Sequence, residues 1–283
     1  MSVTVAEVRS PQVVSVLAHE PLPAAVVKME RLGLRRLPVL HGGRLVGIVT
    51  AGDVRRGLPR LRDPWAFTAQ VGRMRVQDVM RSPVLTARSD EDLRPAVARM
   101  LEGRVGGLPV LDRNGTLVGM LTRGDVLRAE VRRPRLTWGS VDQHMNREVL
   151  TVTAGAPAAE ALRRLRETGR HVLPVLEGEH LVGVVHARDL EAGAEREELD
   201  RTQNAPDAPP LLAGRAVRDL MRPPGGYVLE SAPMHRAMER MLEADVYGLP
   251  VIGEDGVLLG VVTVSDVLGT VLGDWRGEEE APA

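Results

Sequence analysis

The sequence contains no cysteine, one lysine and few aromatic residues. The absence of cysteine excludes disulfides, thiol nucleophiles and cysteine-based metal sites. Aromatic residues make up 2% of the 283 residues, so the cores of this 43% hydrophobic chain must be built from aliphatic side chains and methionine. Because Lys28 is the only lysine, arginine carries nearly all the positive charge, and arginine forms bidentate contacts with carboxylates and phosphates.

Long apolar runs and an excess of one charge are also missing. The longest apolar runs are far below the roughly 20 residues that span a bilayer, and the N-terminal "MSVTVAEVRS" lacks the order of a signal peptide. We therefore expect a cytoplasmic protein. The net charge of −1 argues against a broad nucleic-acid surface. Only the Arg-rich stretches 55–75 and 128–135 keep nucleic acid as a third, least favoured alternative.

Catalytic signatures are absent as well. The seven histidines show no HExxH or other metal spacing, and there is no G-x-S-x-G motif, P-loop or dinucleotide fingerprint. No nucleophile can be paired with a matching base, so we expect neither an enzyme nor a metal site.

The chain is organised as four internal repeats. Each copy has "LPV" and then a Gly, two apolar residues, a Thr, two variable residues and an Asp; the third copy has His in place of Thr. The Pro of "LPV" precedes the Asp by 15 or 16 residues in every copy. The four motifs are "GIVTAGD" (47–53), "GMLTRGD" (119–125), "GVVHARD" (183–189) and "GVVTVSD" (260–266).

The second copy predicts a β-α-β-β-α unit. A short strand at 84–86 precedes an amphipathic helix, which we expect to end at Gly106-Gly107. Two apolar runs, 108–111 and 117–121, flank the hairpin turn "DRNG" and predict strands buried on both faces. A last helix begins near Arg123. The apolar helix positions of the four copies are Ala25, Val26 and Met29; Leu93, Ala96, Val97, Met100 and Leu101; Ala158, Ala161, Leu162 and Leu165; and Met234, Ala237, Met238, Met241 and Leu242.

A single unit of about 60 residues is small for independent stability, so we expect the units to pair. The first two repeats would form one module and the last two another. We expect connecting linkers and a disordered C-terminal tail. The expected boundaries are 1–58, 72–133, 137–195 and 214–273 for the repeats, 59–71 and 196–213 for the linkers, and 274–283 for the tail.

These four copies resemble CBS domains, which pair into Bateman modules, over roughly residues 1–272. The resemblance implies an α/β (α+β) fold of four β-α-β-β-α repeats in two Bateman modules and a disc-like assembly. One chain closes the disc, or two chains pair as a homodimer. The lead-in phrases ending at Met80 and Met221 resemble those of stand-alone bacterial proteins of this family.

The resemblance also implies the site residues. In the family the Thr faces phosphate, the Asp holds ribose, and adenine lies between the lead-in and the backbone before "LPV". Site two would comprise Met80, Pro83, Val105, Gly106, Gly107, Thr122, Arg123 and Asp125. Site one would comprise Arg9, Leu34, Arg35, Arg36, Thr50 and Asp53; site three His186, Arg188 and Asp189; and site four Met221, Val246, Tyr247, Gly248, Thr263 and Asp266.

The Thr-x-x-Asp pattern also has a purely structural explanation, because a Thr three residues before an acidic residue forms a capping box. Capping accounts less well for Asp in all four copies. Site two has the best phosphate and ribose set because Arg123 adjoins its Thr, and we expect Glu230 to replace the first-strand Ser or Thr in site four. His186 either weakens site three or makes it a pH-sensitive phosphate site.

The favoured function is that of a non-catalytic sensor that binds an adenosyl ligand and signals by a change in module orientation to an unknown protein partner. The implied ligands are AMP, ADP, ATP or another adenosyl compound, with Mg²⁺ accompanying polyphosphates and no obligatory cofactor. The alternative is a structural or protein-interaction module whose ligand sites are vestigial.

Overall fold

The computed structural model describes residues 3–57, 71–132, 138–168, 170, 172–187, 189–191, 212, 214–223 and 226–280. The chain divides into two compact units, residues 1–126 (unit 1) and 127–283 (unit 2). Arg188 and nearly all of both expected linkers lie outside the described residues.

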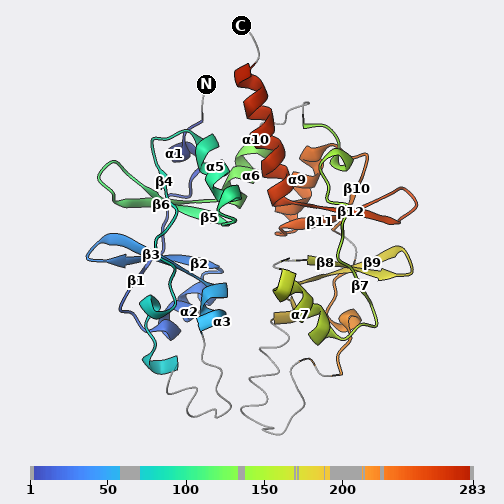
Figure 1. Ribbon diagram of the computed structural model, residues 1–283, viewed down its shortest axis with the longest axis horizontal. Helices are drawn as coiled ribbons and strands as arrows, with labels where there is room; N and C mark the ends of the chain where they lie inside the picture. Colours follow the sequence, from blue (N-terminus) through green and yellow to red (C-terminus); the bar gives the residue numbers. More distant parts are fainter. Residues whose placement is uncertain are drawn as a thin grey trace. The chain divides into compact units, whose positions relative to one another are not determined.

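Unit 1 carries the first two repeats, each with a three-stranded sheet (Figure 1). In each sheet the short first strand pairs parallel with the second, and the second and third form an antiparallel hairpin. Repeat 1 contains α1 (Val5–Val8), β1 (Val16–Leu17), α2 (Leu22–Arg31), β2 (Arg36–His41), β3 (Arg44–Thr50) and α3 (Ala51–Gly57). Repeat 2 contains the 3-10 turn η1 (Val76–Asp78), β4 (Ala87–Arg88), α5 (Leu93–Glu102), β5 (Gly107–Leu111), β6 (Leu117–Thr122) and α6 (Arg123–Val131).

Unit 2 repeats this plan with the same strand order. Repeat 3 contains η3 (Val141–Gln143), β7 (Val152–Thr153), α7 (Ala158–Thr168), β8 (Val172–Glu177) and β9 (His180–His186). Repeat 4 contains η4 (Val217–Asp219), β10 (Val228–Leu229), α9 (Met234–Glu243), β11 (Gly248–Ile252), β12 (Leu258–Thr263) and α10 (Val264–Glu280). The expectation of a disordered tail from residue 274 was wrong, because α10 continues through Glu280.

The apolar face of the central helix in each repeat packs on the sheet as its spacing predicts. In α5, Leu93, Ala96, Val97 and Met100 are buried, while Leu101 is half-buried. The expected helix end at Gly106-Gly107 was wrong: α5 ends at Glu102, with Gly103 as its C-cap and Arg104 at φ 49°. The "DRNG" turn is as predicted, since Gly115 adopts φ 80°.

The two apolar runs of repeat 2 are buried to different extents. In β5 the residues 107–110 are all buried, as expected for a strand covered on both faces. In β6 only Gly119 and Leu121 are buried, so this strand keeps a partly accessible face. The prediction of burial on both faces therefore holds for β5 and fails for β6.

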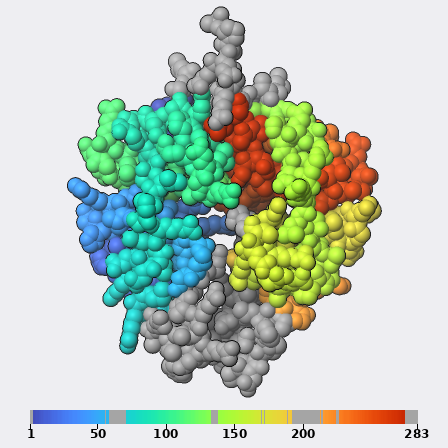
Figure 2. All heavy atoms as spheres, in the orientation of Figure 1, coloured from blue at the N-terminus to red at the C-terminus, as the bar shows by residue number. Residues whose placement is uncertain are grey.

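The segment that precedes the first strand of each repeat, which we call its lead-in, joins the sheet of the other repeat in the same unit. The lead-in of repeat 2 pairs with repeat 1 through the bridges Pro21–Arg75 and Ile48–Arg81. Conversely, the lead-in of repeat 1 pairs with repeat 2, where Ser10 bridges Met120. In Figure 2 the cyan atoms of the segment that begins at residue 71 lie against the blue atoms of repeat 1.

Unit 2 makes the same exchange. Asn146, from the lead-in of repeat 3, bridges Val261 of repeat 4, and Arg222, from the lead-in of repeat 4, bridges Val184 of repeat 3. Lead-in residues also enter the apolar core of the other repeat. Val76 belongs to the core of repeat 1, and Val217 belongs to the core of repeat 3; both are fully buried. The two repeats of a unit therefore share their apolar cores, which explains how such small repeats are stable together.

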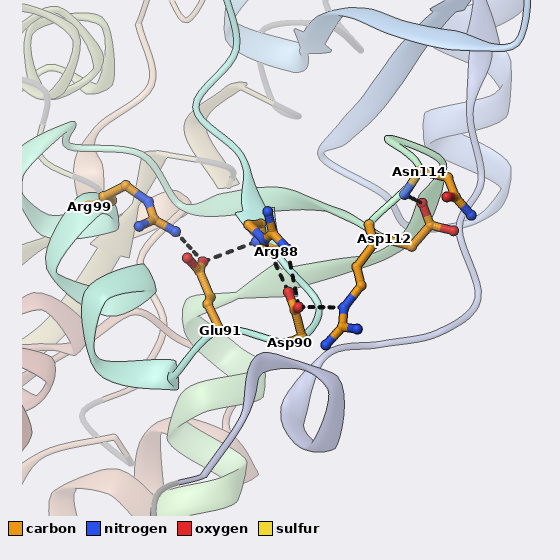
Figure 3. Close-up of polar contacts among 7 residues, drawn as sticks. Arg88, Asp90, Glu91, Arg99, Asp112 and Asn114 are labelled. Carbon is orange, nitrogen blue, oxygen red and sulfur yellow. Dashed lines mark hydrogen bonds and ion pairs between the residues drawn. The ribbon is translucent and has the colours of Figure 1, made fainter.

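An exposed polar network lies at the edge of repeat 2 (Figure 3). Asp90 accepts hydrogen bonds from Arg88 Nε at 3.1 Å and Arg113 Nε at 2.9 Å, and both bonds hold the pKa of its carboxyl well below the usual range. Glu91 accepts from Arg99 and from the Arg88 backbone N–H. This network links the first strand, α5 and the β5–β6 hairpin, and its carboxylates are occupied by local arginines.

Candidate functional site

The Thr and Asp of the repeated motif meet where the last strand of each repeat passes into its final helix. We call these places junction 1 (Thr50, Asp53), junction 2 (Thr122, Asp125), junction 3 (His186, Asp189) and junction 4 (Thr263, Asp266). Three of them have the expected Thr, and all four have the Asp.

The Thr and Asp of a junction cap the helix reciprocally. At junction 2, Asp125 Oδ2 accepts from Thr122 N at 2.8 Å and from Thr122 Oγ1 at 2.5 Å, and Asp125 N donates to Thr122 Oγ1 at 3.2 Å. Junctions 1 and 4 repeat this pattern. Asp is therefore long enough to close this capping box, so the expectation that capping accounts less well for Asp than for Thr was wrong.

The cap, however, uses only one carboxylate oxygen. At junctions 1, 2 and 4 it is Oδ2 that receives both bonds from the Thr. The other oxygen, Oδ1, takes no part in the cap. At junctions 1 and 2 it contacts the lead-in of the other repeat. A carboxylate held in this way has a fixed orientation, and its second oxygen can accept hydrogen bonds from other groups.

The lead-in contacts are made by the residue that follows the Met position. Arg81 Nε donates to Asp53 Oδ1 at 2.6 Å, and Ser10 Oγ donates to Asp125 Oδ1 at 3.0 Å. In unit 2, Arg222 donates to both oxygens of Asp189, from Nε at 2.8 Å and from Nη2 at 2.7 Å. Asn146 is the equivalent residue facing repeat 4.

The exchange of lead-ins corrects the expected grouping of Met80, Met221 and Arg9. Met80 packs on Gly47 of repeat 1, where a Cβ would lie 2.4 Å from its Sδ, and Met221 packs likewise on Gly183 of repeat 3. Arg9 covers Gly119 of repeat 2 and donates to the Val118 carbonyl oxygen at 2.7 Å. Met80 thus belongs beside junction 1, Arg9 beside junction 2 and Met221 beside junction 3; Met145 takes the corresponding place over Gly260.

Pro83 lies on the segment that crosses back from repeat 1 to repeat 2. Arg81 still pairs with Ile48 of repeat 1, whereas Ala87 pairs with Val110 of repeat 2. Pro83 is exposed between these two points.

The sequence could have suggested the exchange of lead-ins only through the small Gly repeated at the first position of each motif, since a Gly there admits a close approach by another segment.

The backbone before "LPV" does meet the junctions as expected. Arg123 N donates to the Gly106 carbonyl at 3.3 Å, Val264 N to that of Tyr247 at 3.0 Å, and Ala51 N to that of Arg35 at 3.1 Å. Arg123 Nε also donates to the Val105 carbonyl at 3.1 Å. In the strand register Gly107 faces Thr122, and Gly248 faces Thr263. Leu34, Val105 and Val246 are held by backbone bonds to Met29, Met100 and Met241 of the preceding helices.

Arg36 is placed differently from our expectation. Its guanidinium lies over the other repeat, where a Cβ on Gly106 would be 2.4 Å from Nη2 and one on Gly107 would be 3.0 Å from Nη1. The equivalent residue of unit 2 is Val172, whose Cγ1 would lie 3.5 Å from a Cβ on Gly248. Arg36 therefore adds to Arg123 near junction 2, and the corresponding positions near junction 4 are the apolar residues Val172 and Val264.

Junction 3 and the first strand of repeat 4 depart from the other copies. His186 is 8% exposed, and its Asp189 is engaged by Arg222. His171 and Arg188 lie outside the described residues. The strand register places Tyr227, and not Glu230, at the position of Ser15, Thr86 and Thr151. The expectation that Glu230 replaces the first-strand Ser or Thr in site four was therefore wrong. Tyr247 is 38% exposed at the start of β11.

The ion pairs at two junctions shift the pKa values of their members. Burial raises the pKa of Asp53, but hydrogen bonds from Thr50, Arg81 and Arg56 outweigh it and lower the pKa below its usual value. Arg56 Nη2 lies 2.5 Å from the same Oδ1 that Arg81 contacts. At junction 3 the hydrogen bond to Asp189 raises the pKa of Arg222. Both shifts favour the ion-paired state.

Neither a metal cluster nor a membrane-spanning helix is found in the part of the chain that the structure describes. Its residues contain no group of three or more His, Asp or Glu side chains placed to hold a metal ion. Among the helices they form, none combines the length and apolar character needed to cross a membrane.

Comparison with known proteins agrees with the repeated fold. The family described as "CBS domain" matches residues 5–60, 76–132, 139–192 and 217–273, which is most of the chain. The chain belongs to the CBS domain family. CBS repeats pair into Bateman modules, and each unit of this chain holds one such pair.

Two similar proteins that cover most of the chain are archaeal. The uncharacterized protein MJ1225 of Methanocaldococcus jannaschii is 24% identical over 267 residues, which cover 91% of this chain and 94% of that protein. Its crystal structure superposes with a TM-score of 0.78 at 23% identity and covers 95% and 100% of the two chains. An uncharacterized conserved protein of Pyrococcus horikoshii superposes with a TM-score of 0.69 at 24% identity, with the same coverage. These likenesses show the fold, and they do not support the expected bacterial character of the protein.

Proposed function

We propose that this protein is a non-catalytic regulatory sensor that binds an adenosyl ligand at the strand–helix junctions of its CBS pairs. The observation that carries the proposal is the different use of the two carboxylate oxygens at junctions 1 and 2. There Oδ2 is fixed by the Thr, and Oδ1 is oriented toward the neighbouring repeat. A fixed carboxylate oxygen suits the two hydroxyl donors of a ribose cis-diol, because an ionised carboxylate accepts hydrogen bonds only.

Junction 2 has the strongest case for an anionic ligand such as AMP, ADP or ATP. Arg123 follows Thr122 directly, and Arg36 lies over the backbone of Gly106 and Gly107. Arginine binds phosphate through charge-assisted, bidentate hydrogen bonds. The small Gly106 and Gly107 allow close approach to the backbone. A polyphosphate would bring Mg²⁺ as its counter-ion.

The signalling step would be a population shift between arrangements of the two repeats in one unit. Arg36 comes from repeat 1, whereas Thr122 and Asp125 come from repeat 2. A ligand that contacts both repeats binds one relative orientation more tightly and shifts the equilibrium toward it. A protein partner would read that orientation. Cytoplasmic location, the disc-like assembly and the homodimer remain predictions.

A thermal-shift panel tests this proposal. We expect at least one of AMP, ADP, ATP, cyclic di-AMP, S-adenosylmethionine and NAD, with and without Mg²⁺, to stabilise the protein. At about 100 times its Kd, a single-site ligand adds about 2.7 kcal/mol to the free energy of unfolding. Asp125→Ala should abolish the response at junction 2.

Asp125 also caps a helix, so its removal will lower stability without any ligand. Asp92 provides the matched control, because its side chain caps α5 by accepting from Arg94 N at 2.9 Å and lies away from the junctions in sequence. Asp92→Ala should cost a similar ~1 kcal/mol and leave the ligand response intact. A protein that responds to no ligand of the panel would favour the competing function, a structural or protein-interaction module.

A further inference from the structure

The junction carboxylates differ in the donors that reach them. Asp53 accepts from Thr50 N and Thr50 Oγ1 on Oδ2, and from Arg56 and Arg81 on Oδ1. An ionised carboxylate has about four lone-pair positions, so Asp53 is saturated. At junction 4, by contrast, Asp266 accepts on Oδ2 from Thr263 alone, and within the described part of the chain Oδ1 has no hydrogen-bond donor.

The difference follows the lead-in residue that faces each Asp. That residue is an arginine at junctions 1 and 3, where Arg81 and Arg222 ion-pair with Asp53 and Asp189. At junctions 2 and 4 it is uncharged. Ser10 donates a single hydroxyl bond to Asp125, and the side-chain oxygen of Asn146 accepts from the backbone N–H of Glu148 instead. Each unit thus contains one junction with a lead-in arginine and one with an uncharged lead-in residue.

We propose that Arg81 and Arg222 are internal occupants of the ribose-binding carboxylates, so that each unit binds its ligand at one junction only: junction 2 in unit 1 and junction 4 in unit 2. This inference rests on the proposed function. A diol must replace the hydrogen bonds of a guanidinium at junctions 1 and 3, and a neutral hydroxyl cannot match a charge-assisted bond. At junction 2 the Ser10 hydroxyl is neutral and can rotate away.

The geometry at both arginine junctions suits this role. The Asp53 side chain is 4% exposed and its two arginines approach from the solvent side, each with a side chain that is 61% exposed. Arg222 forms a bidentate pair with Asp189, in which two parallel hydrogen bonds give the most specific arrangement for an arginine and a carboxylate. Because the lead-in comes from the other repeat, the occupant also ties the two repeats of the unit together.

The test is an equilibrium titration of the full chain with AMP and with S-adenosylmethionine, analysed for the number of sites per chain. We expect junctions 2 and 4 to account for all tight binding in the unmodified protein. The double change Arg56→Ser and Arg81→Ser, which removes both guanidinium donors of Asp53 Oδ1, should open junction 1, and Arg222→Asn should open junction 3. Each should tighten binding there roughly tenfold, which equals about 1.4 kcal/mol. Adding Asp53→Asn to the double variant should remove the gained site.

The reverse change at the lead-in residue should weaken binding at junction 2. Ser10→Arg is expected to weaken binding at junction 2 roughly tenfold. Ala6→Arg is the matched control, because it adds the same charge to an exposed position of the same lead-in and should leave the affinity unchanged.

The outcomes separate this inference from the function on which it rests. Absence of binding by the unmodified protein and every variant overturns both. Binding at four equivalent sites overturns the inference and leaves the proposed sensor function standing. So does a stoichiometry and affinity that the double change Arg56→Ser and Arg81→Ser, Arg222→Asn and Ser10→Arg all leave unchanged.

Discussion

Units 1 and 2 share a backbone plan but differ in the side chain that passes from one repeat to the other. In unit 1 the guanidinium of Arg36 lies over Gly106 and Gly107; in unit 2 the equivalent Val172 faces Gly248. The residue after the junction Thr differs in the same sense, Arg123 against Val264. Both units therefore keep the same exchange of lead-ins, while two positions decide whether the surroundings of the proposed ligand site are cationic or apolar.

The backbone arrangement of a unit and its proposed ligand preference thus depend on different residues. The backbone arrangement depends on the four motif glycines, each covered by a lead-in side chain of the other repeat. The proposed ligand preference depends on residues beside the junctions, Arg36 and Arg123 in unit 1 and Val172 and Val264 in unit 2. Substitution of a motif glycine should consequently lower the free energy of unfolding, whereas substitution of a residue beside a junction should change ligand affinity.

The largest effect is expected from filling the space above a motif glycine. In Gly183→Val the new Cβ would lie 2.8 Å from the Arg222 carbonyl oxygen, and in Gly119→Val it would lie 2.9 Å from that of Ser10. Because backbone must move in both cases, each variant should lose about 3 kcal/mol of unfolding free energy in chemical denaturation. Gly72→Val is the control, because a Cβ added to Gly72 would have no other atom within 4 Å. Gly43 is equally open but unsuitable, since its φ of 78° would strain a valine. A full-stability Gly183→Val protein would show that unit 2 does not depend on the exchange.

Exchanging the cross-repeat residues should transfer the ligand preference between the units. Arg36→Val is expected to weaken AMP binding at junction 2 about tenfold and to reduce its dependence on salt, because a charge-assisted bond to phosphate is lost. Val172→Arg should strengthen binding of the same ligand at junction 4. Titrations at two salt concentrations measure both effects. If Arg36→Val binds AMP as tightly as the unmodified protein, the arginine does not distinguish the units.

The starts of α5 and α9 provide a smaller contrast between the units. Asp92 caps α5 with its side chain, whereas Pro233 at the equivalent position of α9 has no side-chain cap. Asp92→Ala should therefore lower the free energy of unfolding by about 1 kcal/mol, and Pro233→Ala should lower it by much less. Equal losses in urea denaturation would contradict the difference in capping.

The smallest effect is expected in the acid range. The pKa of Asp53 is lower in the folded protein than its usual value of 3.8, so the stability it contributes is present above that value and is lost as the pH falls through the lowered folded pKa. Arg81→Ser should move the pKa of Asp53 upward and flatten this acid dependence of unit 1. Carboxyl NMR titration gives the pKa directly, with Ser10→Ala as a control that leaves Asp53 untouched. An unchanged pKa in Arg81→Ser would contradict the ion pair.

Some of this could be predicted because it depends on short-range patterns. The spacing of Leu93, Ala96, Val97 and Met100 indicated the buried face of α5, and the apolar runs that flank "DRNG" predicted the hairpin. Other features depend on contacts with residues far along the chain, which the sequence does not show. The end of α5 at Glu102, the exposure of one face of β6 and the continuation of α10 beyond residue 274 were missed for that reason.

Local sequence was sufficient for the four repeats, their strand and helix plan, and the Thr and Asp that form the cap at junctions 1, 2 and 4, because each of these is set by neighbours within a few residues along the chain. Which lead-in faces which Asp was settled by tertiary contacts alone. Arg81 lies 28 residues from Asp53, and Ser10 lies 115 residues from Asp125. No local pattern distinguishes pairing within a repeat from pairing across the unit. The shared cores of Val76 and Val217 favour the crossed arrangement, since it buries apolar surface that each small repeat could not cover alone.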